Sequence, residues 1–197
     1  MKKLMLLLGA FMLAALMMSC EKDFLNEEAF KEVPTDAFQK SLLKGVQSGM
    51  SSNAATMNFR AHLSGMNEVP SNESMATGQA IFMVNKEMTE VKYRLIVANL
   101  ENVRMAHIHA APAGVNGGVV AWLYPSMPPP VTIEGTTNGI LAEGTLTSES
   151  LSGSLEGMEI SDLVNLMKSA EVYVNVHTDQ YPTGEIRGQI MSNKGRN

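Results

Sequence analysis

From Asn58 to about residue 192, apolar and polar residues alternate in short segments with a period of two. Between Val91 and Val97, for example, every second residue is valine, tyrosine or leucine. Alternation over four to eight residues, bounded by clusters of glycine, proline, asparagine and serine, is typical of half-buried β-strands. The pattern predicts about nine strands, at residues 58–64, 78–85, 90–98, 103–110, 118–124, 131–133, 139–146, 171–177 and 184–191.

One segment in this region instead has the spacing of a helix. It runs from Ser161 to Lys168, with Ser161 as the expected N-cap. Its apolar side consists of Leu163, Val164, Leu166 and Met167. Many short strands without crossover helices between them predict an all-β fold, an antiparallel sandwich or barrel with one short helix.

The first residues have the pattern of an export signal. The nearly apolar run Leu4–Met18 follows the basic segment Met1–Lys3, and at about 15 residues it is shorter than the ~20 that a spanning helix needs. Cys20 stands at the expected cleavage point, which resembles the signal of a bacterial lipoprotein. Residues 1–19 are therefore predicted to be removed and Cys20 to be lipidated, anchoring the protein to a membrane. The alternative is an ordinary signal peptide followed by an incidental cysteine.

Residues 20–57 are polar and mixed, and they are predicted to form a tether that could hold a short helix after Pro34. Residues 193–197 form a short tail. The segment Cys20–Asn26 resembles the mature start of SusD-like outer-membrane lipoproteins. That resemblance implies a location in the cell envelope, at the outer membrane, on its periplasmic or surface face.

Composition narrows the chemistry that this chain can carry. Its 197 residues suit one domain plus a leader. One cysteine excludes an internal disulfide framework, a cysteine-based zinc knuckle and an iron–sulfur cluster. The chain has 15 basic and 20 acidic residues and no basic run after the leader, so nucleic acid is not an expected partner.

Several motifs, in this order along the chain, resemble the CHRD domain, a module named after chordin and also found in secreted bacterial proteins. They are Leu63–Pro70, Gly78, Ala106–His109, Gly114–Gly117, Tyr173–Thr178 and Gly184–Gln189. The resemblance spans residues 58–192 and departs from the family at Ala170, where glycine is common. It implies a Greek-key sandwich, immunoglobulin-like or superoxide-dismutase-like, and it implies no particular reaction.

The histidines are the candidates for metal binding. His107 and His109 lie two residues apart on a predicted strand, so their side chains leave the same face about 6.5–7 Å apart along it. His177 ends another predicted strand and shares its polar face with Asn175, which makes it the expected third ligand. Three imidazoles would suit one zinc or copper ion. The alternative is a structural polar cluster in which the ring nitrogens bond to backbone carbonyls or nearby side chains.

Counting ligands limits the analogy with known copper proteins. The His-x-His arrangement resembles the copper strand of Cu,Zn superoxide dismutases, but a dinuclear site needs more imidazoles than these three and His62 provide. A blue-copper centre needs a cysteine thiolate, and Cys20 is assigned to the lipid. A mononuclear site remains, and His62 is expected to be a surface residue.

Four further residues could support the histidines as partners outside the ligand shell: Glu68, Asn175, Glu185 and Arg187. Glu185 and Arg187 share a face of the last strand, and an ion pair or cross-strand pair is the ordinary interpretation. The functional interpretation is that they orient His177. Glu68 precedes a turn and would serve either as a loop cap or as a carboxylate near the ion.

The sequence as a whole favours a non-enzymatic, lipid-anchored extracytoplasmic module that binds a protein, a glycan or a small ligand. The second interpretation is a mononuclear copper or zinc protein. An enzyme comes third, because no nucleophile–base pair or carboxylate dyad is visible and only an open position on a three-histidine ion could drive a reaction.

Overall fold

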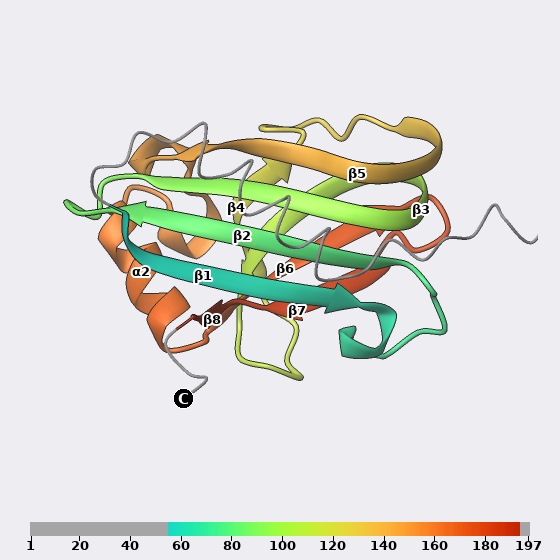
Figure 1. Ribbon diagram of the computed structural model, residues 1–197, viewed down its shortest axis with the longest axis horizontal. Helices are drawn as coiled ribbons and strands as arrows, with labels where there is room; N and C mark the ends of the chain where they lie inside the picture. The colour runs from blue at the N-terminus through green and yellow to red at the C-terminus, as the bar shows by residue number, and fades with distance from the viewer. Residues whose placement is uncertain (1–54, 194–197) are drawn as a thin grey trace, which may run out of the picture. The chain divides into compact units, whose positions relative to one another are not determined.

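The structure, a computed structural model, describes residues 55–193 of the chain. The chain in this range forms one α-helix, α2 (Ile160–Lys168), and short 3₁₀ turns at Gly65–Asn67, Ser148–Ser150 and Gly153–Leu155. The strands are β1 (Ala55–Ser64), β2 (Thr77–Asn85), β3 (Val91–Ala110), β4 (Gly118–Tyr124), β5 (Ile133–Leu146), β6 (Val172–Thr178), β7 (Ile186–Gln189) and β8 (Met191–Ser192). The predicted all-β fold with one short helix is confirmed for these residues (Figure 1).

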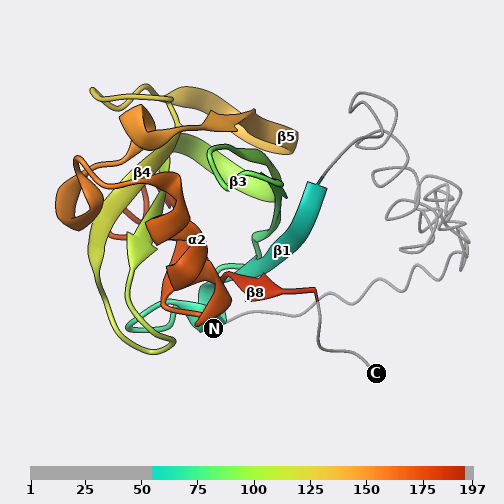
Figure 2. The same cartoon turned by 90° about the vertical axis from the view of Figure 1, so that its left-hand side faces the viewer.

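The strands form one antiparallel sheet that closes on itself. β1 pairs with β2, β2 with β3, β3 with β6, β6 with β7, and β7 returns to β1. β4 and β5 are added to opposite stretches of β3, and β8 runs beside β1. Figure 2 shows the strongly curved sheet with α2 lying across one end. The architecture is therefore barrel-like.

The sheet can close because β3 is a single strand of 20 residues, long enough to pair with β2 along its first part and with β6 along its last part. The sequence pattern predicted two separate strands here, 90–98 and 103–110. Instead the chain continues from one to the other with positive φ at Asn99 and Asn102, and its register against β5 shifts there. Before the bend β3 pairs with β2 and β5, and after it β3 pairs with β4 and β6. Asparagine tolerates positive φ better than most residues, which permits the bend.

The helix begins one residue earlier than predicted, and its N-cap is Glu159 rather than Ser161. Glu159 has extended backbone angles, and the Asp162 carboxylate accepts a hydrogen bond from its backbone N–H at 3.1 Å. This reciprocal capping box satisfies donors that the first turn leaves free. Ile160, Leu163, Val164 and Met167 are buried, so α2 closes the apolar core.

β6 positions the candidate site because every one of its residues is buried. Its valines, Val172, Val174 and Val176, belong to the apolar core. Its opposite face is polar, and loops cover it. The Arg187 guanidinium, on the neighbouring β7, binds carbonyls of one such loop, and Asn72 of another donates to the backbone of Glu185. The strand is thus part of a second, polar interior beneath the loops.

Among residues 55–193, no helix is long and apolar enough to cross a membrane. The predicted signal peptide, Cys20, the short helix after Pro34 and the tail from residue 194 lie outside the described residues. β1 begins at Ala55, three residues before the predicted strand.

Candidate metal centre

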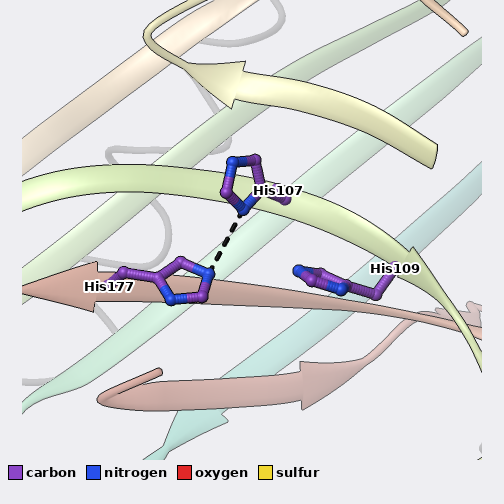
Figure 3. Close-up of side chains that lie close together, drawn as sticks. All are labelled: His107, His109 and His177. Atoms are coloured by element: carbon purple, nitrogen blue, oxygen red, sulfur yellow. Dashed lines mark hydrogen bonds between the residues drawn. The ribbon is translucent and has the colours of Figure 1, made fainter. Parts of the chain in front are cut away.

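Three buried histidines meet on the polar face of β3 and β6. His107 and His109 come from β3 and His177 comes from β6, and their side chains are 3%, 8% and 6% exposed. Each offers one ring nitrogen, and the three nitrogens all lie within 4.8 Å of one another. Figure 3 shows the rings directed toward a common space. The structure therefore brings together the three residues that the sequence singled out.

Backbone carbonyls fix the orientation of two of these rings. The Nδ1–H of His109 donates to the carbonyl oxygen of Gly117 at 2.9 Å, and the Nδ1–H of His177 donates to that of Pro182 at 3.0 Å. Each neutral ring then has a bare Nε2 with a free electron pair. Histidine ligands of metals characteristically donate their second ring nitrogen to a carbonyl or a carboxylate in this way.

The third ring, that of His107, places one nitrogen close enough to a nitrogen of His177 for both to bind the same ion. His107 Nδ1 lies 3.2 Å from His177 Nε2. Two nitrogens bound about 2.0–2.1 Å from one ion in tetrahedral or trigonal geometry lie about 3.3–3.6 Å apart, so this separation needs little adjustment. Without an ion, His107 donates its Nδ1–H to His177, because Nε2 of His177 is the acceptor.

Several buried polar atoms around the rings have no hydrogen-bond partner. They include Nε2 of His107, Nε2 of His109 and Oδ1 of Asn175. Leaving such groups buried and unpaired costs about 1–3 kcal/mol each. The electron pairs of His109 Nε2 and Asn175 Oδ1 are both of the kind that a bound cation would satisfy.

Burial also keeps the three imidazoles neutral. It lowers the pKa of His107 to about 3 and that of His177 to about 4, and neighbouring histidines act in the same direction. Burial lowers the pKa of His109 as well, against the hydrogen bond to Gly117. Only the neutral ring has an electron pair to offer a metal, so none of the three has to lose a net proton before it binds at neutral pH, although His107 has to move its proton from Nδ1 to Nε2.

This predicts that proton competition has little effect on metal affinity down to mildly acidic pH. Three histidines of ordinary pKa, ~6.5, would together lose about 600-fold in affinity between pH 7 and pH 5.5. We expect less than about a tenfold loss of Zn(II) affinity between pH 7 and pH 5.5, measured by chelator competition. Glu68 also titrates in this range, since burial raises its pKa to about 7 against the lowering effect of Arg187. A loss approaching 10³-fold would show that the rings are accessible to protons.

Aromatic rings close the space around the histidines. Trp122 of β4 packs edge to face against His107, with ring centroids 4.2 Å apart. Tyr173 of β6 stacks on His109 at 4.9 Å with nearly parallel planes. Nothing in the local sequence pattern around Trp122 indicated a contact with His107.

The predicted partner residues Glu68, Asn175, Glu185 and Arg187 are all buried. The expected pairing of Glu185 with Arg187 is wrong: no ion pair among residues 55–193 joins them. Glu185 instead accepts hydrogen bonds from the hydroxyls of Ser74 and Thr178, both at 2.6 Å. Loops that cover the polar face supply partners that alternation within one strand does not show.

Arg187 holds the loop that carries the carbonyl partner of His109. Its guanidinium lies 3.4 Å from the centroid of the Tyr173 ring, and it donates to Val115 O at 2.7 Å and to Asn116 Oδ1 at 3.1 Å. Gly117 follows, where an added Cβ would lie 2.0 Å from the Ala110 carbonyl oxygen. The stacked Arg187, Tyr173 and His109 side chains and this loop therefore form one packed unit.

The remaining histidine, His62, is exposed on β1, as the sequence predicted.

A comparison with protein-family models matches residues 59–190 to the CHRD domain. Neither a curated protein nor a solved structure matches the chain.

Proposed function

The chain belongs to the CHRD domain family, and on that premise we propose that it is a non-catalytic module that binds one copper or zinc ion. The ligands are His107, His109 and His177. The observation that carries the proposal is the convergence of three buried, neutral ring nitrogens within 4.8 Å of one another. A purely structural cluster would be expected to pair its buried ring nitrogens, whereas Nε2 of His109 has no partner.

The residues of the chain fit such an ion in two further respects. The carbonyls of Gly117 and Pro182 hold His109 and His177 with their Nε2 electron pairs free. The rings of Trp122 and Tyr173 pack against the ligands and exclude water from two sides. An ion held so deeply is expected to serve binding rather than reaction, because a catalytic metal keeps an open position.

Elemental analysis of the full-length protein, purified without added metal, tests this function. We expect close to one equivalent of copper or zinc per chain, and a melting temperature that falls when a chelator removes it. A protein without stoichiometric metal, whose melting temperature responds to neither Cu²⁺ nor Zn²⁺, would end the proposal and leave the histidines as a structural cluster.

We also propose the location and finer topology that the sequence suggested. The module is anchored through lipidated Cys20 in the cell envelope, at the outer membrane on its periplasmic or surface face. The apolar run before Cys20 supports this location. The strand arrangement is proposed to be the Greek-key form related to immunoglobulin domains or superoxide dismutases, and the His-x-His strand supports that relation. Proteins or glycans remain proposed partners of the anchored module.

The anchor gives a direct prediction. Cys20→Ala removes the acceptor of the lipid, so the variant is expected to move from the membrane fraction to the soluble fraction. Immunoblotting of both fractions after a high-salt wash measures this, with Ser19→Ala, which leaves a small residue before the cysteine, as the control that stays anchored. A Cys20→Ala protein that remains with the membrane would contradict lipidation.

A further inference from the structure

Only three charged side chains are buried among residues 55–193: Glu68, Glu185 and Arg187. All three belong to the polar interior that contains the histidines. Arg187 lies across from Asn175, and Asn175 lies across from His107, in one row over β7, β6 and β3. Above the raised pKa of Glu68, about 7, its carboxyl is ionised, and the three side chains together then carry one net negative charge.

The candidate ligands add no charge of their own. All three are neutral imidazoles, and no carboxylate belongs to the cluster in the described part of the chain. Glu185, the buried carboxylate nearest in sequence to His177, accepts hydrogen bonds from the hydroxyls of Ser74 and Thr178. A singly charged ion would therefore make this polar interior neutral, whereas a doubly charged ion would leave one positive charge unbalanced.

An unbalanced charge is costly at this depth. The cost of moving an ion out of water rises with the square of its charge, so a divalent ion pays about four times as much as a monovalent one. The Arg187 guanidinium raises that cost for a divalent ion, since it stacks on Tyr173, which in turn stacks on His109.

The number of ligands points the same way. Zinc in proteins is almost always four-coordinate, and its fourth ligand is a further side chain or a water in an open position. Here three nitrogens converge, and the rings of Trp122 and Tyr173 pack against two of the ligands. Cu(I), a d¹⁰ ion, is stable with three nitrogen ligands.

We propose that the three-histidine site binds copper as the singly charged Cu(I) ion, in preference to Cu(II) and Zn(II). This rests on the proposed metal-binding function and adds to it the charge and identity of the ion.

Competition titrations of the full-length protein test the preference. Cu(I) is presented under argon with ascorbate and bathocuproine disulfonate, and Zn(II) and Cu(II) are presented in air against chromophoric chelators. We expect Cu(I) to bind at least 100-fold more tightly than either divalent ion, and His62→Ala to leave all three affinities unchanged. Zn(II) or Cu(II) binding as tightly as Cu(I) would overturn the preference while leaving the metal-binding function intact. Failure to bind any of the three ions would instead overturn the function itself.

Two variants test the charge argument in opposite directions. Arg187→Met removes a positive charge, so Zn(II) should gain on Cu(I) at least tenfold. Glu68→Gln removes a negative charge with little change of shape, so both ions should bind more weakly and Zn(II) should lose more. Circular dichroism checks that each variant is folded. If Arg187→Met does not fold, Glu68→Gln alone tests the charge argument. The charge explanation would be overturned if both variants shifted the ratio of Cu(I) affinity to Zn(II) affinity in the same direction. It would also be overturned if Glu68→Gln shifted that ratio toward Zn(II).

Discussion

Replacing His109 by alanine is expected to lower the affinity of the protein for its metal ion at least 100-fold and to abolish the metal-dependent rise in melting temperature. The variant removes one of three nitrogens and leaves two, of which His107 Nδ1 and His177 Nε2 lie 3.2 Å apart. It also removes the ring that the Gly117 carbonyl holds in place. Chelator competition measures the affinity, and thermal melts with chelator and with added metal measure the stabilisation.

His62→Ala is the matched control, because His62 is an exposed histidine on β1 in the same folded unit. It should leave both affinity and stabilisation unchanged. If the three buried histidines serve only as a polar cluster, His109→Ala would instead lose about 1–3 kcal/mol of stability with or without metal. Equal loss in chelator and in metal would therefore contradict the metal site.

The ligands of the candidate site could be predicted from sequence, whereas their supports could not. The two-residue spacing of His107 and His109 places both side chains on one face of a strand whatever the rest of the fold is. His177 carried a similar local signal, as the last polar residue of an alternating strand. The carbonyl partners of these rings belong to Gly117 and Pro182, in loops whose position depends on the whole fold. Main-chain carbonyls occur at every residue, so no sequence pattern distinguishes these two.

The strands, like the ligands, could be predicted where local alternation marks them, but their pairing and covering could not. The polar segment Asn99–Asn102 fell between two predicted strands, because asparagine and glutamate disfavour strand interiors. In the structure it is a bend within β3, held by pairing with β5, which is more than 30 residues away in sequence. Alternation also predicted half-exposed strands at residues 171–177 and 184–191. β6 is buried on both faces because loops cover its polar side, and this decides which partners Glu185 and Arg187 find.

The closure between β1 and β7 leads to a second prediction of large effect. The two strands share the pair Ser64 and Arg187, and the side chain of Asn67 donates to the carbonyl of Arg187 at 3.0 Å and to that of His62 at 3.3 Å. Gly188 lies at this junction. A Cβ at Gly188 would lie 2.4 Å from the carbonyl oxygen of His62, and backbone atoms cannot rotate away as a side chain can.

Gly188→Ala is therefore expected to force β1 and β7 apart and to lower the free energy of unfolding by about 3 kcal/mol. For a folded unit of this size that corresponds to a fall in melting temperature of roughly 10 °C. Gly118→Ala is the matched control, because an added Cβ on Gly118 has nothing within 4 Å and should change stability by less than about 0.5 kcal/mol. Differential scanning calorimetry of the metal-free proteins makes the comparison without a contribution from the ion. If both variants melt within about 2 °C of the wild type, the strands do not approach this closely, and the barrel is not closed at Gly188.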